Sequence, residues 1–365
     1  MIDLGRGKKR GFFKKLGKGL YNNRLRERKQ SPVFVVGCHR SGTNLLYDTL
    51  LSAGGFAIYR GYLPIYKMLI PRFGNLDNLD NRKKLLNTWL RSKGFRRSGL
   101  DAQQLTGKLL AECGNGGDFI RIVMDEIASN QGAVRWAVYD PDNLLHMQRI
   151  KADIPEALFI HVIRDGRDIA LSLSKMKGFT PFPWNRKSRG LRETALYWEW
   201  MVRKGRQYGS LIGDDYIEVR YEELATEPES VLSRLGKFLD HDLDYERIQM
   251  VKLGRLSESN SSFRREAAEK QSNPVNRWRE RLSPRELAGL EAMVGDCLTE
   301  FGYPLSLPEQ QRRPGIREQW MRLVYPSFLD AKLWLKINTP AGRFASLSEL
   351  ELLDSIPGAD SAQIQ

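Results

Sequence analysis

The sequence predicts a three-layer α/β domain built on a mainly parallel sheet. Short apolar segments, typical of buried strands, occur near residues 33–37, 134–139, 157–163 and 216–220, and helical patterns separate them. Parallel strands need crossover connections of this kind, whose helices cover both faces of the sheet. The first strand also runs directly into a glycine-bracketed turn and a helix, an arrangement by which proteins bind phosphate.

The turn after the first strand has the glycine spacing of a nucleotide-binding loop without its metal-binding residues. Gly37 and Gly42 match the glycines of a Walker A motif, but Thr43 replaces the lysine and Asn44 replaces the magnesium-binding Ser or Thr. Backbone N–H groups at the start of the following helix can still bind an anion. The glycines alone also fit an ordinary strand-to-helix turn, whereas Arg40 adds a planar cation suited to oxyanions.

A second strand, charged turn and helix follow from Ala157 onward. Arg164 ends the strand, and Ser172 lies eight residues later in the predicted helix, so both side chains can reach one anionic group at the edge of the sheet. The alternative is a solvated surface cluster of ion pairs, formed by Arg164, Asp165, Arg167 and Asp168. The occurrence of both segments in one chain favours an anion site.

These two segments resemble the signatures of the sulfotransferases that use 3′-phosphoadenosine 5′-phosphosulfate (PAPS). The family's first signature is a strand followed by Pro-Arg-Ser-Gly-Thr-Thr or its lysine form, and here it reads His39-Arg40-Ser41-Gly42-Thr43-Asn44. The resemblance implies that this loop contacts the 5′-phosphosulfate. It also implies that Arg164 and Ser172, which have the family's spacing, bind the 3′-phosphate.

Two weaker correspondences extend the resemblance over residues 32–304. The segment 217–224 looks like the family's strand-to-helix junction near the adenosine, with Tyr221 as the contact. Residues 261–279 are similar to the loop that closes over PAPS, with Ser262 and Arg277 as implied contacts. Trp278, next in sequence, fits that loop and a plain core anchor equally well.

The missing lysine and magnesium ligand are consistent with sulfuryl transfer. A kinase moves a multiply charged phosphoryl group and needs a metal to neutralise the developing charge. A sulfuryl group carries less charge, so no metal is expected here. In-line transfer would need a base for the acceptor proton, and Arg40 with the loop would stabilise the leaving phosphate oxygen.

The general base is less evident. Related enzymes often carry a Glu about twenty residues after the loop arginine, but residues 58–62 contain no carboxylate, and Tyr139-Asp140-Pro141 stands where many carry Lys-Thr-Pro. Asp140 is the candidate base because it follows an apolar strand and should lie at the carboxyl edge of the sheet. Its alternative role is that of an N-cap for a helix beginning at Pro141. The weaker candidates are His39, which lies on the loop, His146 and His161.

The chain of 365 residues, 41% of them hydrophobic, is predicted to hold one catalytic domain and two appendages. The expected division is a basic N-terminal tail over 1–31, the sulfotransferase domain over 32–304, and a C-terminal helical extension and tail over 305–365. Residues 316–337 are amphipathic enough to dock as helices or to mediate pairing. No apolar run reaches bilayer length and the N-terminus lacks the apolar core of a secretory signal, which predicts a cytoplasmic protein.

Most of the net charge of +14 lies in the N-terminal tail. Residues 1–30 hold eleven Lys and Arg against two acidic residues, which leaves a net of +5 for all the others. The body of the protein is therefore not expected to bind nucleic acid. Phe12, Phe13, Leu16 and Leu20 fall on one helical face, so the tail is predicted either to contact an anionic membrane weakly or to remain a solvated coil.

Two further segments are the candidates for contact with the acceptor. Residues 57–131, rich in Tyr and basic residues, are predicted to recognise the acceptor or to serve as helical packing, and residues 179–185 to form a lid or acceptor-facing loop. Cys38, Cys113 and Cys297 are too few and too far apart for a disulfide framework or a zinc site.

The predicted function is transfer of a sulfuryl group from PAPS to a hydroxyl or amine. Carbohydrate, lipid, phenolic metabolite and protein tyrosine all remain open as acceptors. The alternatives are a P-loop nucleotide kinase and a nucleotide-binding protein that has lost catalysis.

Overall fold

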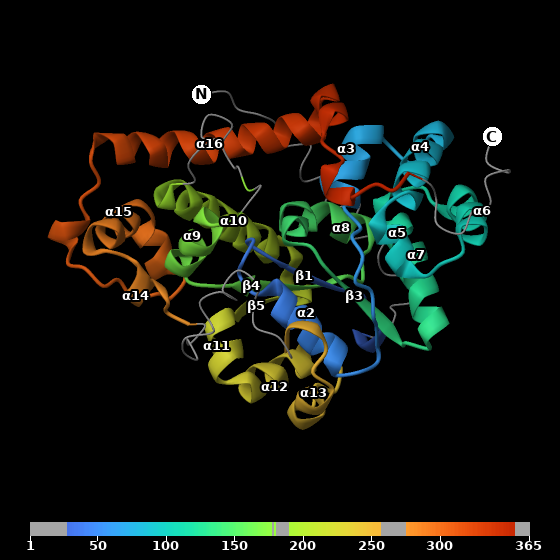
Figure 1. Cartoon of the computed structure of the whole chain (residues 1–365), viewed down its shortest axis with the longest axis horizontal. Coiled ribbons are helices and arrows are strands. Elements are labelled where there is room, and N and C mark those ends of the chain that lie inside the picture. The colour runs from blue at the N-terminus through green and yellow to red at the C-terminus, as the bar shows by residue number, and fades with distance from the viewer. Residues whose placement is uncertain (1–27, 177–178, 180–189, 257–274, 355–365) are drawn as a thin grey trace.

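The described part of the chain forms a five-stranded parallel sheet with helices on both faces (Figure 1). The computed structural model describes residues 28–176, 179, 190–256 and 275–354. The strand order is β2-β3-β1-β4-β5. The bounds are Val33–Gly37 for β1, Phe56–Ala57 for β2, Arg135–Tyr139 for β3, Leu158–Ile163 for β4 and Tyr216–Arg220 for β5. The predicted three-layer α/β fold with a mainly parallel sheet is confirmed.

The central strands β1 and β4 are buried along their whole length, as expected for strands covered on both faces. Their register pairs Val35 with Ile160 and Gly37 with Val162. Strand β2 lies at the opposite end of the sheet from β5 and pairs only two residues with β3. The sequence did not predict β2, because two residues carry no periodic pattern.

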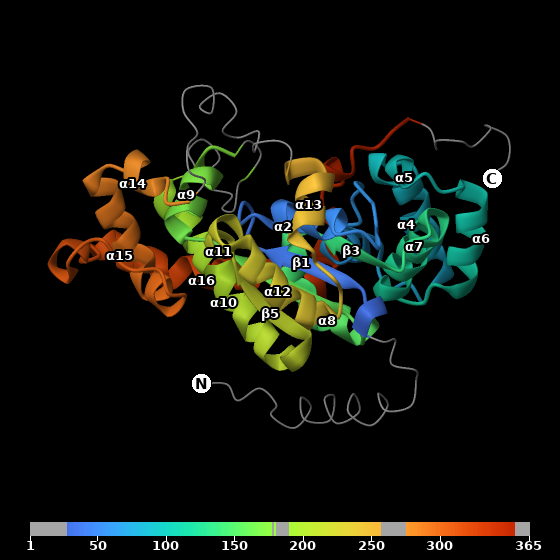
Figure 2. The ribbon, with the colours of Figure 1, turned by 90° about the horizontal axis from the view of Figure 1, so that it is seen from below.

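One layer of helices packs on the face that Val33, Val35, Ile160 and Val162 present. Figure 2 shows this layer towards the viewer. Side chains alternate along a strand, so these residues point to the same side of the sheet. The layer consists of α2 (Thr43–Ser52), α11 (Tyr221–Thr226), α12 (Pro228–Leu239) and α13 (Tyr245–Val251), with the short turn η5 (Gly254–Leu256) after it.

The other layer packs on the opposite face, where Phe34, Trp136 and Phe159 form an aromatic cluster. Its longest helix, α10, buries two tryptophans, Trp198 and Trp200, on the side turned to the core. The layer consists of α7 (Gly116–Gln131), η3 (Pro141–His146), α8 (Met147–Asp153), α9 (Gly166–Ser174) and α10 (Leu191–Ile212), and η4 (Gly213–Asp215) leads into β5.

The segment between β2 and β3 is almost entirely helical. Trp89 anchors it, with its ring 5.4 Å from those of Phe95 and Phe119. Helical packing therefore accounts for most of residues 57–131, and recognition of the acceptor by this segment stays a prediction. Its elements besides α7 are the π-helical turn η2 (Ile65–Leu69), α3 (Ile70–Phe73), α4 (Leu79–Leu90), α5 (Lys93–Ser98) and α6 (Ala102–Glu112).

The C-terminal part folds back over the layer that contains α10 (Figure 1). Helix α16 buries Met321, Tyr325 and Leu329, and Trp200 Nε1 donates a hydrogen bond of 2.8 Å to Asp330. Among the described helices, none combines the length and the apolar character needed to cross a bilayer. The remaining elements are η1 (Arg28–Gln30), α14 (Trp278–Arg281), α15 (Pro284–Glu300), η7 (Glu309–Arg312), α16 (Ile316–Asn338), η8 (Pro340–Phe344) and η9 (Ser348–Leu350).

Candidate active site

The turn between β1 and α2 requires both of its glycines. The Ser41 hydroxyl donates to the Cys38 carbonyl at 2.6 Å, which closes the turn. Gly42, the N-cap of α2, has a φ of 98°, and a Cβ there would lie 2.3 Å from the ring of Tyr221. A Cβ on Gly37 would lie 2.6 Å from the Val162 carbonyl oxygen. Only glycine allows this close backbone approach, which leaves the N-terminus of α2, beginning at Thr43, facing the space above the sheet.

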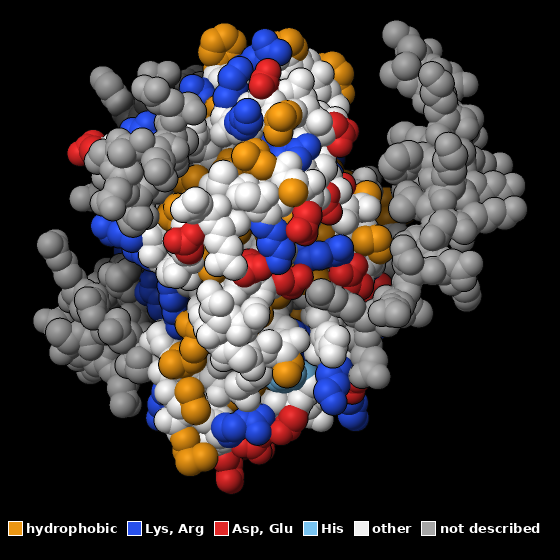
Figure 3. Space-filling view, turned by 90° about the vertical axis from the view of Figure 1, so that its right-hand side faces the viewer, with side chains coloured by type: hydrophobic (Ala, Val, Ile, Leu, Met, Phe, Trp, Pro, Cys, Tyr) orange, Lys and Arg blue, Asp and Glu red, His pale blue; other side chains and the backbone are white. Residues whose placement is uncertain are grey.

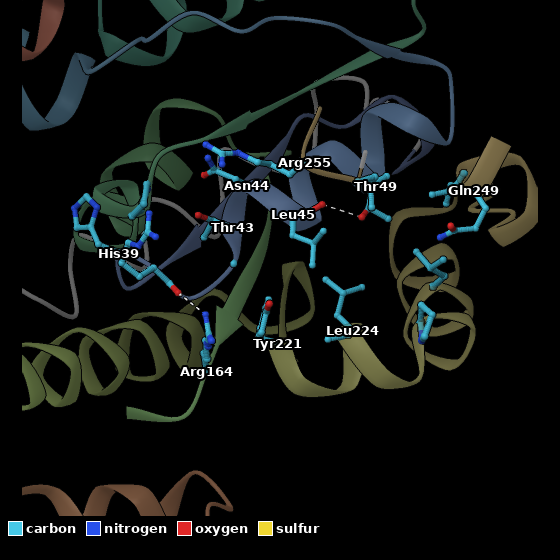
Figure 4. A pocket seen from close by; sticks show the side chains of 18 of the residues that line it. His39, Thr43, Asn44, Leu45, Thr49, Arg164, Tyr221, Leu224, Gln249 and Arg255 are labelled. Atoms are coloured by element: carbon cyan, nitrogen blue, oxygen red, sulfur yellow. Dashed lines mark hydrogen bonds between the residues drawn. The ribbon is translucent and has the colours of Figure 1, made fainter. Parts of the chain in front are cut away.

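Arg40 joins the two sequence motifs. Its Nε donates to Ser172 Oγ at 2.9 Å, and its carbonyl oxygen accepts a hydrogen bond of 3.3 Å from Arg164 Nη1 (Figure 4). Its φ of 73° is unusual for a residue other than glycine, and such strain is typical of functional sites. The structure therefore brings together Arg40, Arg164 and Ser172, which the sequence predicted to contact one ligand.

Arg164 is held from several sides. Its guanidinium lies 4.3 Å from the centre of the Tyr221 ring, and Nη2 approaches Asp168 at 3.4 Å. The indole N–H of Trp198 donates to its carbonyl oxygen at 3.0 Å. The charged residues around it are buried, with Arg164 only 6% exposed. The alternative of a solvated surface cluster is therefore wrong.

A network of buried ion pairs around Arg167 supports the part of the site that holds Arg164. Arg167 donates to Asp165 at 2.7 Å and to Glu291 at 2.8 Å, and its guanidinium lies 3.7 Å from the centre of the Trp278 ring. Trp278 is buried, which agrees with a core anchor, and its backbone N–H donates to Asp168 at 2.9 Å. Arg277, just before it, reaches the site, whereas Ser262 lies outside the described residues.

These elements enclose a cavity of about 540 Å³ with a cationic part and an apolar part (Figure 4). Besides Arg40, Arg164 and Arg277, the cationic part includes Arg255, which the sequence gave no pattern to find. Burial and the neighbouring arginines lower the pKa of Arg40 and of Arg277. Such repulsion favours an anionic ligand. The apolar part is formed by Leu45, Leu224, Ala225, Pro228, Leu232 and Ile248.

The sequence-predicted residues Thr43 and Asn44 also line this cavity, as does Tyr221, whose ring lies against Gly42. Ser41 is buried in the turn. The Asp48 carboxylate of α2 accepts a 2.7 Å hydrogen bond from the Arg255 N–H and pairs with Arg60, which ties η5 to the loop helix. Among the described residues, no group of three or more His, Cys, Asp or Glu is arranged to hold a metal ion.

Asp140 caps the turn η3, as its alternative interpretation predicted. Its Oδ1 accepts a 3.0 Å hydrogen bond from the Asp142 N–H, and its buried Oδ2 has no hydrogen-bond partner within the part of the chain that the structure describes. Burial and the charge of Asp142 raise the pKa of Asp140 to about 6, although Lys67 and His39 oppose the increase. Asp140 lines a separate cavity of about 20 Å³ beside Tyr139, and is not among the residues that line the large one.

His39 instead belongs to the wall of the large cavity and takes part in a group of charged residues that we call the acid–base cluster, formed by His39, Lys67, Asp140 and Asp142. His39 Nε2 lies 3.3 Å from Asp142 Oδ2, and Lys67 Nζ lies 2.5 Å from the same oxygen. Burial alone would lower the pKa of His39, but Asp142 raises it above the ordinary value. Both cations keep the pKa of Asp142 well below its usual range.

Sequence reasoning missed Asp142 and Lys67, because nothing in their spacing links residue 67 to residue 142. The other two candidate histidines are buried away from the large cavity. His161 is fully buried in β4 with Nδ1 2.7 Å from the Tyr216 hydroxyl, and burial lowers its pKa to about 4. Burial also lowers the pKa of His146 to about 4. Both are packing residues in this arrangement.

The chain belongs to the sulfotransferase family, whose family model matches residues 32–245. This confirms the resemblance drawn from the two sequence motifs, and it does not favour a P-loop nucleotide kinase. The comparison with curated proteins gave no significant match.

Solved structures similar to this chain include sulfotransferases. The sulfotransferase domain of the Synechococcus PCC 7002 olefin synthase is 19% identical, with a TM-score of 0.51, and the match covers 78% of this chain and 99% of that one. The sulfotransferase domain from the curacin biosynthetic pathway is 19% identical over 78% and 95% of the two chains, with a TM-score of 0.43. Sulfotransferase STF9 from Mycobacterium avium is 15% identical over 81% and 82%, with a TM-score of 0.41. The first of these shows the same fold.

Proposed function

We propose that this sulfotransferase transfers a sulfuryl group from PAPS to a hydroxyl or amine acceptor. The observation that carries the proposal is the large cavity, in which Arg40, Arg164, Arg255 and Arg277 face one space beside an apolar wall. A donor with a phosphosulfate, a second phosphate and a planar base matches that division between charge and apolar surface. The proposal assigns catalysis to residues 32–304 and treats residues 305–365 as an extension.

The binding mode follows from the contacts between the motifs. The N-terminus of α2, with Thr43, would hold the 5′-phosphosulfate through backbone N–H groups and the helix dipole. Arg164 and Ser172 would bind the 3′-phosphate, since both already contact Arg40 at the edge of that loop. The base would pack between Tyr221 and the apolar side chains of α11 and α12.

Catalysis would need no metal in this arrangement. PAPS supplies the activated sulfuryl group. The acceptor oxygen or nitrogen forms a bond to sulfur while the bond from sulfur to the bridging phosphate oxygen breaks, and 3′,5′-adenosine bisphosphate leaves. Arg40 and the N–H groups of the loop stabilise the negative charge that develops on that phosphate oxygen.

His39 is the base that the geometry favours over Asp140. It lines the large cavity next to Arg40, which would hold the reacting group, whereas Asp140 lines the small one. The contact with Asp142 fixes the imidazole ring and stabilises the imidazolium that forms when it accepts the acceptor proton. Lys67 keeps Asp142 ionised.

Calorimetry with 3′,5′-adenosine bisphosphate and 5′-AMP tests the donor assignment. The bisphosphate should bind at least about tenfold more tightly, because a charge-assisted hydrogen bond contributes about 1.5–3 kcal/mol. Arg164→Ala should abolish the preference. Arg96→Ala, which removes an exposed charge of α5, is the matched control and should preserve it. Equal affinity of the wild-type protein for both ligands would contradict the proposal.

Transfer of labelled sulfate from PAPS then distinguishes an enzyme from a nucleotide-binding protein without catalysis. The acceptor panel needs a carbohydrate, a hydroxylated lipid, a phenol, a tyrosine peptide and an amine, because nothing in the donor half selects among them. Binding of the bisphosphate without transfer to any of these classes would favour the non-catalytic alternative.

A further inference from the structure

The outward face of α16 carries a stripe of exposed apolar side chains, which Ser327 interrupts. Ile316, Trp320, Leu323 and Trp334 are 89%, 57%, 73% and 59% exposed. Their spacing of three, four and eleven residues places them on one side of the helix, along a length of about 27 Å at ~1.5 Å per residue. Phe344 in η8, just beyond the helix, is 87% exposed. Large apolar side chains gathered in this way mark an interaction surface.

The stripe belongs to a helix that is firmly attached to the protein. On its inward face Met321, Tyr325 and Leu329 are buried. Lys204 pairs with Asp330 at 3.0 Å and Arg192 pairs with Glu318 at 3.4 Å. The apolar stripe is therefore not the side that α16 uses to dock on the domain, and folding of the described chain leaves it facing outward.

The charge around the stripe is positive. Residues 313–344 contain six Lys or Arg and two acidic residues, a net of +4, whereas the chain beyond residue 30 carries only +5. Both acidic residues of this segment, Glu318 and Asp330, are paired with cations of α10. The segment therefore accounts for +4 of the +5, although its Arg322 is paired with Asp296 at 2.7 Å. Figure 3, which views the molecule from the right-hand side of Figure 1, shows hydrophobic and basic side chains together along the upper edge, with an acidic one among them.

We propose that the outward face of α16 lies on an anionic membrane surface. Two tryptophans within an apolar stripe, flanked by basic residues, are typical of helices that lie in the plane of a membrane interface. Arg313 and Arg317 near one end and Arg343 near the other are exposed, and they are placed to reach lipid phosphates while the stripe enters the acyl boundary. The membrane, and not a partner protein, would complete the surface.

Charge also decides against a second copy of the chain as the occupant. A symmetric dimer through α16 would place two segments of +4 against each other, and such like-charge contact is unfavourable. An anionic lipid surface has the opposite sign and attracts basic segments. The inference is independent of the N-terminal tail and of the sulfotransferase reaction, since it rests on described residues of α16 and η8.

Vesicle sedimentation of the full-length protein tests this proposal. Vesicles of phosphatidylcholine with about 30 mol% phosphatidylglycerol are compared with pure phosphatidylcholine. Because the basic tail can bind the same lipids, the assay is run in a full-length background with Lys8, Lys9, Lys14 and Lys15 changed to Ser. Binding in that background should require the anionic lipid and weaken with added salt.

The double variant Trp320→Ser and Trp334→Ser should then lower the vesicle partition coefficient at least about tenfold. The control variant Leu211→Ser and Met250→Ser removes two other exposed apolar side chains, 58% and 79% exposed, and should bind as before. Circular dichroism and thermal unfolding verify that both variants fold. Equal binding of the two double variants would overturn the proposal. Dimers in analytical ultracentrifugation that dissociate in the tryptophan variant would assign the surface to a second copy instead.

Discussion

The phosphate side of the large cavity and the acid–base cluster, which reaches that cavity through His39, are built from different parts of the chain. The phosphate side, formed by Arg40, Gly42, Arg164 and Tyr221, comes from the ends of β1, β4 and β5, which are neighbours in the sheet. The acid–base cluster draws His39 from the same loop but Asp140 and Asp142 from the end of β3 and Lys67 from the helical segment after β2.

This difference indicates how each side is specified. The phosphate side depends on backbone geometry that short motifs encode, namely the left-handed conformations at Arg40 and Gly42 and the close approach of Tyr221. The acid–base cluster depends on long side chains that meet across segments far apart in sequence. We therefore expect the phosphate side to be shared widely within the family and the cluster to vary with the acceptor.

The largest expected effect is the loss of turnover when Arg40 of the phosphate side is replaced. Arg40→Asn should lower kcat about 10³-fold, because a donor aimed at developing charge contributes that much in comparable sites. Asparagine tolerates the φ of 73° better than alanine does, so the loop should keep its conformation. Steady-state kinetics with labelled PAPS measure the effect, with Arg96→Ala as the control. A loss confined to KM would mean that Arg40 only binds the donor.

The second prediction compares two ion pairs, that of Glu291 with Arg167 next to the phosphate side and that of Glu349 with Lys67 of the acid–base cluster. Glu291→Gln removes a carboxylate that is fully buried against Arg167, so the free energy of unfolding should fall by about 3 kcal/mol. Glu349→Gln removes a half-exposed partner of Lys67 and should cost less than about 1 kcal/mol. Urea unfolding curves of both variants test the contrast. Equal losses would show that the phosphate side is not the more rigidly supported one.

The third prediction concerns the base. His39→Asn should lower kcat about 10²-fold, which is the usual contribution of a general base. The affinity for 3′,5′-adenosine bisphosphate should stay within about twofold, since His39 is assigned to the acceptor proton and not to the donor. His241→Asn changes a histidine outside the cavity and serves as the control. A matching loss in Asp140→Asn, with His39→Asn active, would restore Asp140 as the base.

The smallest effect is a shift of the pH profile. Asp142 raises the pKa of His39, so the activity of the wild-type enzyme should rise with pH as His39 loses its proton at a pH above its ordinary value. In Asp142→Asn burial still lowers that pKa, and only the smaller raising effect of Asp140 remains, so the rising limb should move to lower pH. Profiles of kcat/KM against pH measure the shift. A rising limb that does not move would show that the pH dependence does not come from the ionisation of His39.

Much of the fold was predictable because its signals are local. The strands expected near 33–37, 134–139, 157–163 and 216–220 lie where β1, β3, β4 and β5 are found. Continuous apolar runs are visible in sequence because these strands are buried on both faces. The predicted helical region at 316–337 corresponds to α16, whose inward and outward faces both carry apolar residues.

Other features were out of reach of sequence reasoning. The sequence of the charged turn after β4 fits a solvated surface cluster as well as it fits an anion site. Nothing in the neighbouring residues reveals that α15 brings Glu291 into contact with Arg167. The place of Asp140 after a strand predicts a base at the sheet edge, but a place at the sheet edge does not say which cavity a side chain lines. The role of residues 57–131 in acceptor recognition stays a prediction. The predicted lid or acceptor-facing loop at 179–185 lies, except for Phe179, outside the described residues.

The sequence by itself determined the family, the parallel sheet and the glycine-bracketed turn after β1, because glycines and strand-ending arginines act through the backbone close to them. Only the tertiary structure decided which arginines face one cavity, which histidine lines it and which carboxylate holds that histidine. Those relations depend on where the crossover helices place segments that are far apart in sequence. The spacing of residues along the chain does not encode the distances between the side chains of such segments.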